Sequence, residues 1–104
     1  MKTITNETAG KFEEYLRREE RSGNTIAKYM RDIRLFRAWL GERPIDKAAV
    51  SEYKKALCER YAAKSVNSML SSLNALFAFT GQHGLRVKTL KIQRRIFADK
   101  SKEL

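Results

Sequence analysis

The chain has 104 residues and is strongly basic, with 22 Lys and Arg against 12 Asp and Glu and a formal net charge of +10. This length allows a single domain with at most a tail, and the 42% of hydrophobic residues can fill one small core, which excludes the disordered class. A single cysteine, Cys58, excludes an internal disulfide and a cysteine-rich zinc site, so we expect a reducing, cytoplasmic compartment.

Apolar spacing and capping residues predict two helices in the first half of the chain. The first covers about residues 6–21 and ends before Gly23. The second begins at a cap supplied by Ser22 or Asn24 and runs to Leu40, where Gly41 follows. Its large apolar side chains recur every three or four positions and form one face: Ile26, Tyr29, Met30, Ile33, Phe36 and Leu40.

A third helix is predicted to begin at Asp46, which is placed as its N-cap. Ile45 and Val50 have the spacing of a hydrophobic staple across this start. Its apolar face continues through Tyr53, Leu57 and Tyr61. The sequence therefore predicts a third amphipathic helix with one apolar face.

A fourth helix is predicted over residues 65–80, within a run of 20 residues that contains no Lys, Arg, Asp or Glu. Its Ser and Asn residues are too many for a membrane span. One face is apolar: Val66, Met69, Leu70, Leu73, Leu76 and Phe77. The opposite face is small and neutral: Asn67, Ser68, Ser71, Ser72, Asn74, Ala75 and Ala78. Such a face allows the close approach of either a DNA groove or another helix.

The helical pattern ends after Leu85, and the last 20 residues hold seven basic side chains against two acidic ones. We expect an extended, basic linker there. The residues that could act in catalysis or bind a metal are not arranged as a catalytic or metal site. His83 stands alone in a loop, and Glu13 and Glu14 are spaced to pair with arginines one helical turn away. No metal or other cofactor is predicted.

The excess of positive charge favours a polyanionic partner, with nucleic acid ahead of an acidic membrane. Thr25, Lys28 and Arg31 lie off the apolar face of the second helix, near its N-terminal end. Short side chains on the fourth helix would let its backbone approach a major groove, while neighbouring Lys and Arg reach phosphates. The two helices together predict a DNA-binding surface.

Two blocks carry a resemblance to a known family: GNTIAKYMRDIRLFRAWL at 23–40 and AKSVNSMLSSLNALFAFTGQHGL at 63–85. Together they resemble the N-terminal core-binding domain of tyrosine recombinases, the phage integrase family. The first block matches the family pattern at Thr25, Tyr29, Asp32, Ile33, Phe36, Trp39 and Leu40. The second matches it at Ser65, Asn67, Leu70, Ser71, Leu73 and Phe77. The closing LKIQRRIFADKSKEL is similar to the linker that leads into the catalytic domain.

This resemblance implies an all-α, SAM-like orthogonal bundle of four main helices over residues 1–85 and a basic interdomain linker over 86–104. It also implies that the second and fourth helices face the major groove of double-stranded DNA at a recombination site. Carried over by position, the DNA-binding residues are Asn24, Thr25, Lys28, Arg31, Lys64, Ser65, Asn67, Ser68, Ser71, Ser72, Arg86, Lys88, Lys91, Arg94 and Arg95.

The family's catalytic Arg, His and Tyr residues belong to a C-terminal domain that we expect this chain to lack, so no enzymatic activity is predicted for it. Its tyrosines lie on the apolar faces of predicted helices and are not expected to act as nucleophiles: Tyr15, Tyr29, Tyr53 and Tyr61. The resemblance implies a bacterial or mobile-element origin, and a parent protein that forms a tetramer on DNA. This chain alone is expected to be monomeric.

A different class of function stays open at this point. The chain is also compatible with a freestanding helical adaptor that binds protein through the small face of the fourth helix and an apolar patch at Leu35 and Trp39. The basic tail would then be incidental or would bind RNA.

Overall fold

A computed structural model describes residues 4–91, and within this range it contains helices and no strands. The four helices are α1 (Asn6–Arg18), α2 (Gly23–Leu40), α3 (Lys47–Arg60) and α4 (Ala63–Phe79), followed by the short 3₁₀ helix η1 (His83–Leu85). The predicted all-α bundle of four main helices is confirmed.

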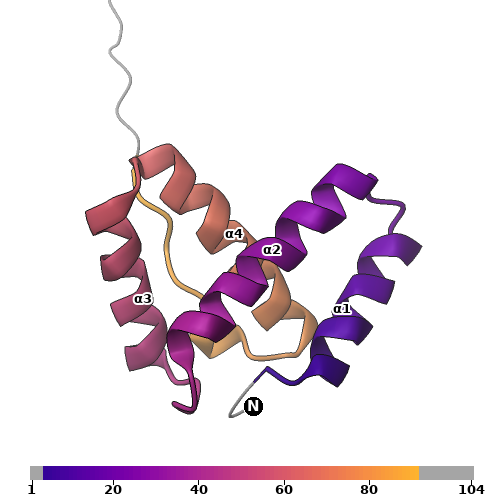
Figure 1. The fold of residues 1–104 in the computed structure, drawn as a ribbon, viewed down its shortest axis with the longest axis horizontal. Coiled ribbons are helices and arrows are strands. Elements are labelled where there is room, and N and C mark those ends of the chain that lie inside the picture. The colour runs from indigo at the N-terminus through magenta and orange to yellow at the C-terminus, as the bar shows by residue number, and fades with distance from the viewer. Residues whose placement is uncertain (1–3, 92–104) are drawn as a thin grey trace, which may run out of the picture.

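The centre of the fold is the crossing of α2 with α4 (Figure 1). In the view of Figure 1, α1 lies to the right, beside the first half of α2, and α3 lies to the left. The side chains at the centre are fully buried and come from all four helices, with the three phenylalanines Phe12, Phe36 and Phe77 as the largest. Each helix therefore buries one apolar face against the crossing.

Three of the four helix starts use a side-chain cap. The hydroxyl of Ser22, one of the two caps that the sequence allowed for α2, accepts from the Thr25 amide at 3.1 Å. The carboxylate of Asp46 accepts from the Ala49 amide at 2.7 Å, as predicted from the sequence. Thr5 caps α1 in the same way. Gly41 follows α2 with φ of 64°, a left-handed conformation that glycine adopts without strain.

Two sequence predictions about helix ends are wrong. The first helix ends at Arg18 rather than near residue 21, because the chain turns away at Glu20, whose φ is 59°. Tyr61 is not on the core face of the third helix but 40% exposed. It is the C-cap of α3 with an extended backbone, and this change of conformation takes its side chain out of the helical register.

Residues 86–91 return along the bundle between α3 and α4 (Figure 1). The side-chain amide of Asn74 exchanges two hydrogen bonds with the backbone of Val87, and that of Asn67 does the same with Leu90. The distance along α4 from Asn67 to Asn74 matches the distance along the chain from Val87 to Leu90, because seven helical residues rise about 10.5 Å and three extended residues span about 10 Å. The segment is thus an extended strand-like strap, with Val87 buried in the core.

Replacing Asn74 by alanine should release this strap, because the Val87 amide loses its acceptor, Asn74 Oδ1, and the loss of two such hydrogen bonds costs about 1–3 kcal/mol. Hydrogen exchange at Val87 should then become at least tenfold faster. Ser71→Ala, at an exposed position on the same helix, is the matched control and should leave the exchange unchanged. Unaltered protection of Val87 in Asn74→Ala would show that the amide does not hold the strap.

Candidate nucleic-acid interface

The N-terminal ends of α2 and α4 lie along the same edge of the molecule, the upper edge in Figure 1. The yellow end of the described segment that follows η1 reaches this edge too (Figure 1). Neither helix has an acidic residue in its first turn. Each helix start carries a partial positive charge from its unpaired backbone amides, so the two ends together favour an anionic partner.

A groove runs between α2 and α4 at this edge. Its floor and walls combine polar and apolar side chains from α2 and α4 with Tyr61 from the connection before α4: Lys28, Arg31, Asp32, Leu35, Tyr61, Ser65, Ser68 and Met69. The exposed residues Asn24, Lys64 and Ser65 lie at or beside the two helix starts. The structure therefore brings polar and cationic side chains of α2 and α4, which are distant in the sequence, onto one surface.

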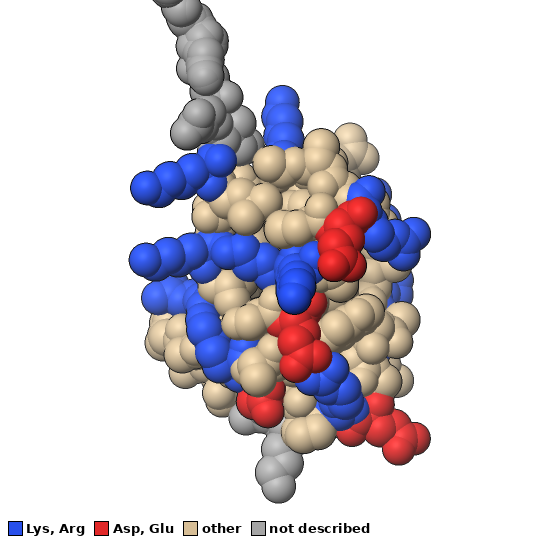
Figure 2. Space-filling view, turned by 90° about the vertical axis from the view of Figure 1, so that its left-hand side faces the viewer, with Lys and Arg blue, Asp and Glu red and all other residues tan. Residues whose placement is uncertain are grey.

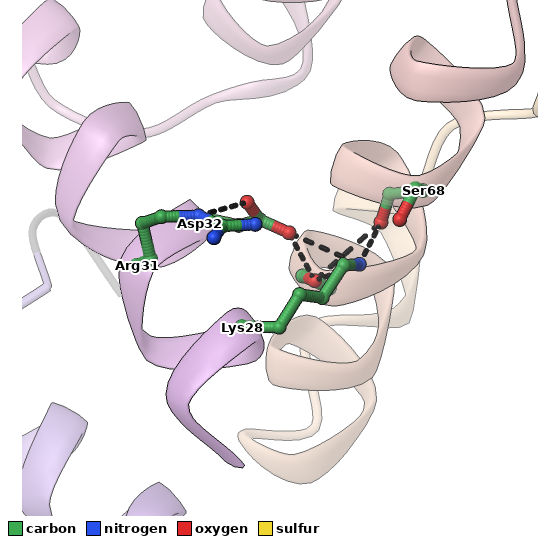
Figure 3. Close-up of polar contacts among 5 residues, drawn as sticks. Lys28, Arg31, Asp32 and Ser68 are labelled. Carbon is green, nitrogen blue, oxygen red and sulfur yellow. Dashed lines mark hydrogen bonds and ion pairs between the residues drawn. The ribbon is translucent and has the colours of Figure 1, made fainter. Parts of the chain in front are cut away.

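The groove contains a buried ionic network (Figure 3). Lys28 reaches from α2 to α4, where its Nζ lies 3.1 Å from Asp32 Oδ2, 2.9 Å from Ser72 Oγ and 2.5 Å from the backbone oxygen of Ser68. Ser72 in turn donates to Asp32 Oδ2 at 2.7 Å. A lysine ammonium has three protons to donate, and the network provides an acceptor for each of them.

The position of Ser72 corrects the sequence prediction. It was expected on the outward, small face of the fourth helix, but it is fully buried. The physical reason is Asp32, whose side chain is 2% exposed and lies against α4, where a buried carboxylate requires hydrogen-bond donors. Ser72 supplies one of them, so its hydroxyl faces the bundle.

Arg31 approaches the same carboxylate from the other side and stays largely in solvent (Figure 3). Its Nε lies 3.8 Å from Asp32 Oδ1, and 63% of its side chain is exposed. Since a guanidinium has five donors in a planar fork, most of them remain available for a phosphate. Of the two cations of α2 in the groove, Arg31 is therefore the one available to an external partner.

The remaining predicted residues of the two helices divide into two groups. Ser68 and Ser71 are exposed, as are Asn24, Lys64 and Ser65. Thr25 is half-buried and its hydroxyl accepts from Ser22 at 2.9 Å, while both polar atoms of the Asn67 amide are engaged by Leu90. The structure thus assigns Thr25 and Asn67 partners within the chain.

The predicted cations of the tail lie on the strap. Arg86, Lys88 and Lys91 are exposed, and Arg94 and Arg95 lie outside the described residues. Lys47 and Lys54 of α3 donate to the backbone oxygens of Arg86 and Lys88 and so fasten the strap from the other side. Figure 2, which faces the side formed by α3, shows Lys and Arg projecting over much of this surface.

Sequence reasoning missed four residues of this surface: Asp32 as a buried anion, Asn74, Lys47 and Lys54. Signals for them exist in the spacing, because Lys28 and Asp32 are four apart on one helix face, a favourable ion-pair spacing. Asn67 and Asn74 are seven apart, as are Lys47 and Lys54, and in each pair both side chains bind the strap.

The tyrosines lie in different environments. Tyr15 and Tyr29 pack against the core, and burial raises the pKa of Tyr53 to about 12, with further contributions from the charges of Asp32 and Tyr61. A phenol in this environment is held protonated and is a poor nucleophile. Among residues 4–91, no group of His, Cys, Asp and Glu side chains could hold a metal ion.

Comparison with known protein families decides the classification. Residues 10–84 match the model of the phage integrase, N-terminal SAM-like domain. The chain belongs to this family. The family model covers α2, α3 and α4 completely and most of α1, and it includes the first sequence block and all but the last residue of the second. The predicted family is confirmed.

Family membership associates the chain with DNA integration and recombination. The comparisons with curated proteins and with solved structures gave no match. Within the described residues, none of the helices has the length and apolar character that crossing a membrane requires.

Proposed function

We propose that this integrase-family domain binds double-stranded DNA at a recombination site through the edge formed by the N-terminal ends of α2 and α4. The observation that carries the proposal is that two helix starts without acidic residues lie along one edge of the molecule, with the exposed cation Lys64 in the first turn of α4 and the exposed cation Arg31 in the groove between the helices. Helix starts and cations both attract phosphates, and short side chains between them leave space for a groove wall.

The contacts proposed for the two helices differ in kind. Arg31 and Lys64 neutralise phosphates, whereas Asn24, Ser65, Ser68 and Ser71 offer short polar groups to base edges or phosphate oxygens. Lys28, Asn67, Ser72 and Thr25 support the surface from within. Arg86, Lys88 and Lys91 extend the cationic path along the strap, and Arg94 and Arg95 would continue it.

In this proposal the domain is the N-terminal half of a recombinase clamp. Strand cleavage then belongs to a catalytic domain with the family's Arg, His and nucleophilic Tyr, and the tetramer of the parent protein depends on that domain as well. The domain alone is monomeric and binds DNA with modest affinity, since it encloses only one side of the duplex.

A salt titration tests this mode of binding. Five exposed cations on the proposed path, Arg31, Lys64, Arg86, Lys88 and Lys91, would release counterions from about five phosphates. The logarithm of the association constant for a short mixed-sequence duplex should then fall with the logarithm of salt at a slope of about −4 to −5. A slope near zero, measured by fluorescence anisotropy, would refute it.

The adaptor hypothesis requires two surfaces, the apolar patch at Leu35 and Trp39 and the small face of α4. Leu35, Trp39 and Tyr61 are exposed by 44%, 37% and 40% and line a common groove with Met69. Three residues of the small face of α4 are engaged within the chain, because Asn67 and Asn74 hold the strap and Ser72 is buried. The exposed cations beside this face favour DNA as the partner of the residues that remain.

A further inference from the structure

The buried polar residues of the core have a specific location. Among the residues that the structure describes, Asp32 and Ser72 are the buried polar or charged side chains, and both lie where α2 crosses α4. Taking a carboxylate out of water is costly, and apolar side chains of similar size often stabilise a core equally well. A role other than stability is therefore to be sought for this network.

The network joins two helices rather than two neighbours on one helix. Lys28 and Asp32 belong to α2, whereas the Ser68 carbonyl and the Ser72 hydroxyl belong to α4 (Figure 3). These hydrogen bonds are directional, unlike the apolar contacts around them, so they fix both the separation and the rotation of the two helices. They do so beside the groove that opens on the proposed DNA-binding edge.

The network also determines which cation is free. Lys28 is 27% exposed in its side chain, and its three protons are directed at Asp32, Ser72 and the Ser68 carbonyl. Arg31, one turn further and 63% exposed, contacts the same carboxylate only at 3.8 Å. The two adjacent cations of α2 thus have different positions, one inside the helix crossing and one outside it.

We propose that Asp32 is a positioning residue for DNA binding: it retains Lys28 within the α2–α4 crossing and thereby fixes the angle at which the two helices present their polar side chains. This inference rests on the proposed DNA-binding function. In this inference Lys28 holds the helices together and Arg31 contacts the phosphate. The sequence alone had placed Lys28 among the DNA-binding residues.

Positioning and simple electrostatics predict opposite effects for Asp32→Asn. The substitution removes a negative charge beside the binding edge, so electrostatic attraction alone would tighten the complex with DNA. If Asp32 positions the helices, the loss of its charged hydrogen bonds should instead weaken binding, by roughly tenfold. The direction of the change therefore distinguishes the two.

The experiment compares the wild type with Asp32→Asn, Lys28→Met and Arg31→Met in anisotropy titrations on one mixed-sequence duplex at several salt concentrations. All are measured at a temperature at which circular dichroism shows them folded. Lys28→Met should weaken binding with an unchanged salt slope, whereas Arg31→Met should reduce the slope by about 0.9, the value for one phosphate. Val50→Ala, a buried change in α3 that removes no member of the network, controls for stability and should bind as the wild type does.

Two results would overturn the inference while the proposed function stands: binding by Asp32→Asn that equals or exceeds the wild type, or a loss of slope in Lys28→Met equal to that in Arg31→Met. Salt-independent binding by the wild type would instead refute the proposed function. If Asp32→Asn does not fold, Ser72→Ala provides the test, because it keeps both charges and removes one link between the helices. It should weaken binding with the slope unchanged, and wild-type affinity would overturn the inference.

Discussion

Replacing Phe36 by alanine is expected to lower the free energy of unfolding by about 3–5 kcal/mol. Its ring is fully buried and lies 4.9 Å from the ring of Tyr53 on α3 and 6.4 Å from that of Phe77 on α4, measured between centroids. One side chain thus joins three helices. Since small domains have only about 5–15 kcal/mol of stability in total, much of the fold's margin should be lost.

Urea denaturation followed by circular dichroism measures this effect, and Phe79→Ala is the matched control. Phe79 is also an aromatic residue in a ring cluster, 4.9 Å from Tyr15, but it is only partly buried. Phe79→Ala should therefore lower the free energy of unfolding distinctly less than Phe36→Ala does, because less apolar surface is exposed to water. Equal losses from the two substitutions would contradict the placement of the core at the α2–α4 crossing.

The largest effect on DNA binding is expected from the double substitution Arg31→Ala and Lys64→Ala. Arg31 lines the groove from α2 and Lys64 lies in the first turn of α4, and both are exposed. Their removal should take away two phosphate contacts and reduce the salt slope by about 1.8. At low salt the affinity should fall by roughly 100-fold, about tenfold per lost contact. Anisotropy titrations on the same duplex measure both quantities.

The control for this prediction is Lys11→Ala with Arg18→Ala, which removes the same charge from α1. Both of these cations are exposed and lie near glutamates, Lys11 at 3.4 Å from Glu7 and Arg18 at 4.0 Å from Glu14. If binding depends on a defined edge, the control pair should change the affinity only slightly. Equal losses from the two pairs would mean that DNA responds to net charge alone.

Local signals explain why the helices could be predicted from the sequence. Ser22 and Asp46 cap the helices that they precede, and Gly41 ends α2, since each acts through contacts within a few residues. The apolar faces of α2 and α4 likewise follow from spacing along one helix. The exception, the early end of α1, results from the backbone reversal at Glu20, for which the glutamate itself gives no signal.

The roles of the small polar residues could not be predicted in this way, because their partners are distant in the sequence. Ser72 is buried on account of Asp32, 40 positions earlier, and Asn67 is engaged by Leu90, 23 positions later. A serine or asparagine on a helix suits both water and a buried partner, so spacing alone placed them outward. The exposed members of the same face, Ser68 and Ser71, were placed as the structure has them.

The face that meets DNA can be located directly by amide chemical-shift mapping of the isotope-labelled domain with a short duplex. Binding through the proposed edge should shift the amides of Asn24, Ser65 and Ser68 and leave those of Gly10 and Glu14, exposed on α1, in place. Shifts confined to α1, or no shifts at any residue at low salt, would contradict DNA binding by the ends of α2 and α4.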